Sequence, residues 1–217
     1  MIKEGIAMGI IEAYKENPCG VLSIPYWKNK NIRIPENMRI VYDADYVEED
    51  YQDYHDEPYF RLYHTLVDVQ TITLEDISIV TAKHNDIPRF VEVINQSYTD
   101  LSVTFEQLNG YTKTAVFCPE LWICAVDKVT ACIVACGIAD FDKEVNEGII
   151  EWVQVMPAYR GKGIGQLIVS ELLKRMAGIA DFATVSGKVN NPTSPEMLYR
   201  KCGFVGKDVW HILTKKK

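Results

Sequence analysis

The stretch from Val153 to Gln166 constrains the fold more than any other part of this 217-residue chain, and it reads V-Q-V-M-P-A-Y-R-G-K-G-I-G-Q. An extended run before Pro157 leads into three glycines at alternate positions, and an amphipathic helical pattern follows them. Glycine lets the backbone turn sharply and leaves its N–H groups unobstructed. The stretch therefore predicts a strand, a tight loop and the start of a helix.

The loop has the chemistry of a diphosphate site. The first amides of a helix have no partner within it, and the helix dipole favours negative charge at that end. Arg160 and Lys162 add two cations. Two nucleotide loops do not fit, since G-x-G-x-x-G fails at Gln166 and no G-x-x-x-x-G-K-[ST] occurs. The alternatives are a nucleotide-binding enzyme that still uses this loop, or a plain strand-to-helix turn, for which one glycine would be enough.

From residue 77 onward the sequence alternates between strand and helix patterns. Predicted strands cover residues 77–82, 121–126, 131–139, 148–156, 182–189 and 204–214, and predicted helices cover 86–98, 104–117, 163–177 and the stretch from Thr193 or Ser194 to Gly203. This order indicates an α/β domain of about 140 residues.

The first 70 residues lie outside this series. They are predicted to form an N-terminal extension, followed by the main domain at 71–217. Residues 4–16 have the spacing of a helix. Residues 41–64, the acidic segment, hold eight acidic side chains against Arg61 alone, together with six tyrosines. One interpretation is a solvated connector whose tyrosines pack on the neighbouring domain, and the other is a substrate-facing lid lined for a cationic group.

Composition argues against several classes of protein. The net charge of -7 disfavours a nucleic-acid partner, because an acidic protein repels a phosphate backbone. No apolar run approaches the ~18 to 20 residues of a membrane helix, and the N-terminus lacks a signal-peptide pattern. The six cysteines include no C-x-x-C pair, which favours free thiols over a metal site. We therefore expect a soluble cytoplasmic protein with no membrane partner.

Two blocks of sequence resemble the GNAT superfamily of acyl-CoA N-acyltransferases. The family signature Q/R-x-x-G-x-G/A stands at Arg160–Gly165, after a run similar to the family's V-x-P-x-x-R-G-K-G. After the next strand comes an asparagine, Asn190 or Asn191, and then Leu198–Phe204, which matches the family's L-Y-x-K-x-G-F block. The interval from Asn191 to Tyr199 is one residue longer than usual, which leaves open which asparagine corresponds to the family's.

The resemblance implies a mixed, twisted central sheet of about six to seven strands flanked by about four helices, with an N-terminal α/β extension. In the family the sheet splits between the strands at 148–156 and 182–189, and the pantetheine arm of acetyl-CoA enters the split. By this resemblance the cofactor contacts are Val153, Gln154, Val155, Arg160, Gly161, Lys162, Gly163, Ile164, Gly165, Asn190 and Asn191. A free backbone N–H at a strand bulge near Val155 would polarise the thioester carbonyl. The resemblance implies no metal.

Two residues are candidates for the chemistry. Tyr199 matches the family's tyrosine and is predicted to protonate the departing thiolate. Glu151 is predicted to accept the amine proton, because it precedes Val153 by two residues and so shares its face of the strand. Glu147 is a competitor for that role. The four histidines form no visible constellation.

The sequence thus predicts an acetyl-CoA-dependent N-acetyltransferase, in which a primary amine of a small molecule or peptide attacks the acetyl group directly. The alternative is a non-catalytic module that binds acyl-CoA, with residues 1–70 as a partner-binding or regulatory surface. The acceptor does not follow from the sequence. Nor does the oligomeric state, for which a homodimer is one option.

Overall fold

The computed structural model describes residues 2–97 and 102–216, and for residues 2–8 it describes the backbone alone. Tyr98, the predicted last residue of a helix, lies outside the described residues. The chain divides into two compact units. The central unit comprises residues 65–183 and 201–203, and the terminal unit comprises residues 1–64, 184–200 and 204–217.

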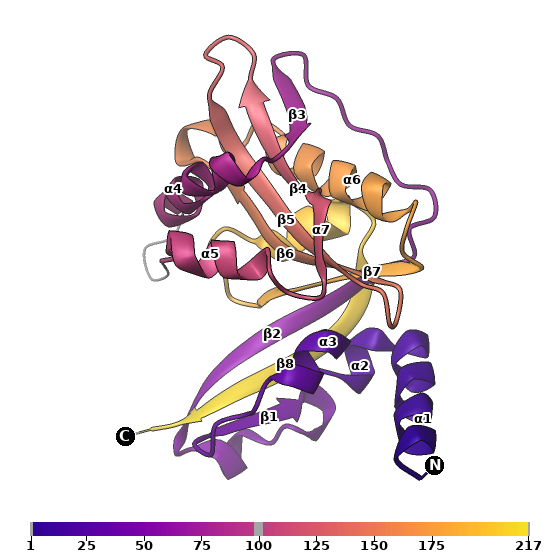
Figure 1. The fold of residues 1–217 in the computed structure, drawn as a ribbon. Helices are drawn as coiled ribbons and strands as arrows, with labels where there is room; N and C mark the ends of the chain where they lie inside the picture. Colours follow the sequence, from indigo (N-terminus) through magenta and orange to yellow (C-terminus); the bar gives the residue numbers. More distant parts are fainter. Residues whose placement is uncertain (1, 98–101, 217) are drawn as a thin grey trace. The chain divides into compact units, whose positions relative to one another are not determined.

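Four consecutive strands of the central unit pair as an antiparallel meander (Figure 1). They are β3 (Ile77–Thr81), β4 (Phe117–Asp127), β5 (Ile133–Asp142) and β6 (Glu147–Val155). In register, Ile79 lies opposite Ala125, and Gly137 lies opposite Val153. These are the runs rich in β-branched residues that predicted strands, and the prediction is confirmed for all four.

Helices cover both faces of this meander. Residues of α4 (Ile87–Ser97) and α5 (Phe105–Tyr111) pack on one face, in a core formed by Ile87, Phe90, Val93, Ile94, Leu108, Trp122, Cys124, Cys136 and Ile138. The helix α6 (Ile164–Met176) covers the other face. A Cβ on Gly137 would lie 2.6 Å from Cγ2 of Ile168, so glycine is what lets β5 and α6 approach closely.

The helix predicted at 104–117 is shorter than expected. Thr104 caps α5 through a reciprocal pair of hydrogen bonds with Gln107, and the helix ends at Tyr111. The hydroxyls of Thr112 and Thr114 donate to nearby backbone carbonyls, which is an alternative to continuing the helix. The last residue of the predicted helix, Phe117, instead begins β4.

The terminal unit combines both ends of the chain. Its helices are α1 (Ile2–Glu16), α2 (Pro18–Val21) and α3 (Tyr26–Asn31), together with most of α7 (Pro195–Lys201). Its strands are β1 (Met38–Tyr42), β2 (Tyr54–His64) and β8 (Val205–Lys215), together with the end of β7 (Phe182–Lys188), whose first two residues belong to the central unit. Strand β8 pairs antiparallel with both β1 and β2.

The acidic segment forms secondary structure of its own. Two short 3-10 helices, η1 (Asp43–Asp45) and η2 (Glu48–Tyr51), lead directly into β2. The ring of Tyr46 stacks on the His211 imidazole of β8, with 3.8 Å between the ring centroids. The same imidazole lies between two carboxylates, with Nδ1 2.8 Å from Asp56 and Nε2 3.2 Å from Asp43. Aromatic and polar contacts to β8 therefore hold this segment within the terminal unit.

The α/β class is confirmed. The described residues contain eight strands, one or two more than predicted, because β1 and β2 lie in the part of the chain that was predicted as an extension. Two further 3-10 helices, η3 (His84–Asp86) and η4 (Pro157–Tyr159), precede α4 and the glycine loop. Within residues 2–97 and 102–216, no helix is long and apolar enough to cross a membrane.

Candidate functional site

The glycine loop of the central unit has the predicted strand–loop–helix form. Strand β6 ends at Val155, η4 follows, and α6 begins at Ile164. Gly161 has φ 76° and Gly163 has φ 79°, both in the left-handed region. That region costs an L-residue with a side chain roughly 1–2 kcal/mol, which explains glycine at both positions. An added Cβ would meet nothing within 4 Å at Gly161, and only Leu74, at 3.8 Å, at Gly163.

The amides at the start of α6 are available for an anion. The first bond of the helix runs from Leu167 N to the Gly163 carbonyl, at 3.0 Å. The amides of residues 164–166 precede this bond, so the helix offers them no acceptor. Gly163 caps the helix without a side chain that could accept from them. The first turn holds no acidic residue that would offset the positive end of the helix dipole. Lys174 and Arg175 lie in the last turn, beside the negative end of the dipole.

The two cations of the loop are held differently. Nε of Arg160 donates to the Val155 carbonyl, and its Nη2 donates to the Ser97 carbonyl at the end of α4, both at 3.2 Å. These bonds tie the loop to β6 and α4. Lys162 is instead exposed, with its ammonium 4.9 Å from the centre of the Tyr159 ring.

The end of β6 is regular, and its irregularity lies further back. Val153, Gln154 and Val155 pair in register with Gly137, Cys136 and Ala135. The register shifts between Ile138, opposite Trp152, and Ala139, opposite Ile150. The predicted bulge near Val155 is therefore wrong for this pairing, because the extra residue is Glu151.

The position of Glu151 changes the argument for it as a base. The prediction that Glu151 and Val153 share a face assumed that side chains alternate without interruption along the strand. The register shift at Glu151 interrupts this alternation, so the assumption does not hold. The side chain of Glu151 is half-buried, whereas that of its competitor Glu147 is fully buried. Glu151 is therefore the more accessible of the two residues, although its Oε1 is buried, and its role as the base stays a prediction.

Three predicted site residues belong to the terminal unit. Tyr199 of α7 is 7% exposed, with ring centroids 6.3 Å from Phe60 and 5.8 Å from Phe204. Oδ1 of Asn191 accepts from the amide and the hydroxyl of Thr193, at 2.9 and 2.8 Å, so this side chain is used in its own turn. Asn190 is exposed.

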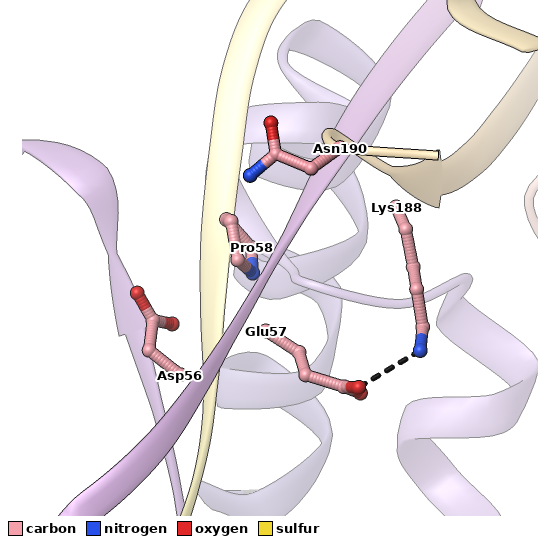
Figure 2. Close-up of a pocket in the computed structure, with 5 residues that line it drawn as sticks. All are labelled: Asp56, Glu57, Pro58, Lys188 and Asn190. Atoms are coloured by element: carbon pink, nitrogen blue, oxygen red, sulfur yellow. Dashed lines mark hydrogen bonds and ion pairs between the residues drawn. The ribbon is translucent and has the colours of Figure 1, made fainter. Parts of the chain in front are cut away.

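Asn190 helps to line a shallow pocket of about 170 Å³ in the terminal unit (Figure 2). The other lining residues are Asp56, Glu57, Pro58 and Lys188. The Lys188 ammonium lies 2.8 Å from a Glu57 carboxylate oxygen, which partly neutralises the pocket. Oδ1 of Asn191 is engaged within its turn and Asn190 is exposed, so contact of Asn190 with the cofactor is the stronger of the two predictions.

The structure thus brings one set of predicted residues together in the central unit. These are Glu151, Val153, Gln154, Val155, Arg160, Gly161, Lys162, Gly163, Ile164 and Gly165. One contact of this loop was not predicted: the Tyr159 hydroxyl donates to Asp127, the last residue of β4, at 3.0 Å. The four-residue hairpin turn is visible in the sequence, but nothing in the sequence pairs it with a residue 32 positions away.

Comparison with known proteins defines the class of this site. Residues 119–206 match the family model of the acetyltransferase (GNAT) domain. The match covers β6, the glycine loop and the Tyr199 block. Over these residues the sequence is similar to the GNAT domain, which agrees with the resemblance seen in its motifs. No curated protein matches the sequence of the chain.

Solved structures share this fold. A GCN5-related N-acetyltransferase from Sphaerobacter thermophilus has a TM-score of 0.68 and 21% identity, over 83% of this chain and 61% of that one. The ribosomal-protein-S18-alanine N-acetyltransferase from Escherichia coli has a TM-score of 0.51 and 14% identity, over 65% and 95%. A structure of the NatC complex bound to Gag peptide and CoA gives 0.52 and 18%, over 65% and 99%. Similarity at these identities shows a common fold.

Proposed function

We propose that the chain is an acetyl-CoA-dependent N-acetyltransferase that acetylates a primary amine of a small molecule or peptide. The observation that carries the proposal is the glycine loop at the start of α6, with left-handed Gly161 and Gly163, in a region that matches the GNAT domain. The acetyltransferases among the structures with this fold, one of them bound to CoA, support it.

The residues of the loop fit a diphosphate. The amides of residues 164–166 would donate to its oxygens, and Lys162 would add a positive charge. The space beside Gly161 is open, so a ligand can approach the backbone there. The backbone of Val153 and Val155 would hold the pantetheine arm, as the family resemblance implies. Bound in this way, acetyl-CoA supplies an activated acetyl group.

The reaction needs an unprotonated amine and a proton for the leaving sulfur. The amine nitrogen forms a bond to the acetyl carbon, and the bond from that carbon to sulfur breaks. Glu151 would take the proton that the amine loses, directly or through water. Tyr199 would give a hydrogen bond or a proton to the thiolate. A phenol pKa of about 10 against a thiol pKa of about 8.5 favours the hydrogen bond.

The burial of Tyr199 favours one alternative. Its ring is 7% exposed and packs near Phe60 and Phe204, which is the environment of a packing residue. If packing is its only role, the proposed reaction has no group for the leaving sulfur, which favours a module that binds acyl-CoA without catalysis. The two functions differ in turnover and not in cofactor binding.

Release of free thiol distinguishes them. We would incubate the protein with acetyl-CoA and a panel of primary amines and peptides, with a thiol-reactive dye and mass spectrometry of the amine as readouts. Turnover with at least one amine, and slower turnover at unchanged CoA affinity in Tyr199→Phe, would support the enzyme. CoA binding without turnover across the panel would support the module. Absence of CoA binding would contradict both.

A further inference from the structure

A hydrogen bond fixes the ring of Tyr159 beside the glycine loop. The Tyr159 hydroxyl donates to Oδ2 of Asp127 at 3.0 Å. The other oxygen of this carboxylate, Oδ1, accepts from the amides of Val129 and Thr130, both at 2.9 Å. The carboxylate therefore uses one oxygen to hold the β4–β5 turn and the other to hold the residue before the loop.

The charges of the two groups agree with this geometry. The pKa of Tyr159 is raised, most strongly by its hydrogen bond to Asp127. The pKa of Asp127 is lowered, most strongly by the Thr130 amide and also by the Tyr159 hydroxyl. A neutral phenol therefore donates to an ionised carboxylate. Both side chains are only half-buried, so solvent screens the bond and it contributes little to the free energy of unfolding.

The ring of Tyr159 in turn supports Lys162. The lysine ammonium lies 4.9 Å from the ring centre, within the range of a cation–π contact. Lys162 stands between the two left-handed glycines, just before the first amides of α6. An exposed lysine samples many rotamers, and contact with a fixed ring restricts them.

We infer that Tyr159, held by Asp127, positions the Lys162 ammonium for the diphosphate of CoA, so that the β4–β5 turn is part of the support of the donor site. Tyr159 is a positioning residue in this arrangement and acts through Lys162. The inference rests on the proposed function, because it assigns residues to the binding of acetyl-CoA.

Affinity for CoA, measured by calorimetry without any acceptor, tests this role. Tyr159→Phe keeps the ring and removes its hydroxyl, and should weaken CoA binding about two- to threefold, because the lost bond is screened by solvent and acts only through Lys162. Asp127→Ala should have the same effect, and the double variant should be no weaker than either single one. Asp127→Asn keeps one acceptor oxygen for the turn amides and places an amide N–H opposite the Tyr159 oxygen, which can accept from it, so this variant should restore most of the affinity.

The Lys162→Ala variant tests whether Tyr159 acts through Lys162, because a merely structural role of Tyr159 would not depend on the lysine. In the Lys162→Ala background, Tyr159→Phe should leave CoA affinity unchanged. With an accepted amine, Tyr159→Phe should raise KM for acetyl-CoA and leave kcat and the KM of the amine within twofold. Tyr63→Phe, in the terminal unit, is the matched control and should behave as wild type.

The outcomes separate the inference from the proposed function. If wild type binds CoA and Tyr159→Phe binds it with the same affinity, the positioning role is overturned and the proposed function is not. Equal losses from Tyr159→Phe with and without Lys162 would also overturn it, because the effect would not pass through the lysine. A wild-type protein that binds no CoA would overturn the proposed function and this inference together.

Discussion

Gly163 connects backbone geometry to the proposed donor site at the scale of a single residue. Its φ of 79° is left-handed, and an added Cβ would meet only Leu74, at 3.8 Å. A side chain at this position therefore brings backbone strain but no collision with residues 2–97 or 102–216. Asparagine and aspartate accept the left-handed region more readily than other residues with a side chain. They are nearly equal in size and differ in charge, which makes them a matched pair.

We expect Gly163→Asn and Gly163→Asp to fold with similar stability, and only the asparagine variant to bind CoA. Each should lose about 1 kcal/mol of unfolding free energy from strain. The carboxylate should repel the diphosphate, whereas the amide should only weaken its binding. Thermal unfolding compares the stabilities, and calorimetry compares the affinities. Equal CoA affinity in the two variants would contradict a diphosphate at this loop.

The cysteines differ sharply in access to solvent. Cys132 is exposed, whereas Cys124 and Cys136 face each other in the β4–β5 pairing and are fully buried. Burial raises the pKa of the Cys124 thiol to about 12 and raises the pKa of Cys136 as well. The thiolate is the reactive form, so both buried thiols should be inert in the folded protein.

We predict that a thiol reagent labels Cys132 first in the native protein, and that Cys132→Ser removes the fast phase. Peptide mass spectrometry after a short reaction identifies the labelled site. Labelling of Cys124 or Cys136 at the rate of Cys132 would show that this core opens readily, contrary to the packing of α4 and α5 described above.

At the scale of elements, a hydrogen bond between two half-buried side chains links two strands of the terminal unit. Tyr42 of β1 donates to Asp208 of β8 at 2.7 Å. This bond is the largest of the causes that raise the pKa of Tyr42 to about 12. The folded-state pKa therefore exceeds the unfolded value of about 10. The resulting stabilisation is complete below pH 10 and is lost as the pH rises through about 12.

We expect the unfolding free energy of wild type to decrease between pH 10 and 12 more steeply than that of Tyr42→Phe. Urea unfolding at several pH values measures both, with Tyr63→Phe as the control for the loss of one tyrosine. Solvent screening keeps the difference small, because the hydroxyl is near the surface. Parallel pH profiles for wild type and Tyr42→Phe would contradict a specific contribution of this bond.

Elements with a strong local pattern were predictable from sequence. Strand β6, the glycine loop and α6 follow from alternation, glycine spacing and helical periodicity, all of which are local. The end of α5 was not predictable, because it depends on two threonine hydroxyls that bond to the backbone and on the pairing of Phe117 with Asp140. The bulge at Glu151 was also missed, because the local pattern gives no sign of a register set by β5.

At the scale of the whole molecule, pairings between distant parts of the chain limited the prediction. Trp210 of β8 lies opposite both Tyr42 of β1 and Tyr59 of β2. No local pattern shows that strands so far apart in sequence pair, so the sequence leaves the acidic segment open between a connector and a lid. The GNAT match at 119–206 extends over parts of both compact units. A domain boundary near residue 70 stays a prediction.

Amide NMR of the ¹⁵N-labelled protein during a titration with CoA tests the central claim most directly. The account predicts that the signals of Gly161, Gly163 and Gly165 move or broaden at low CoA concentration, while those of Gly9 and Gly178 do not. ATP and NAD should need far higher concentrations for the same effect. Loop signals that stay in place at saturating CoA, or that respond equally to ATP, would contradict the assignment of this loop to CoA.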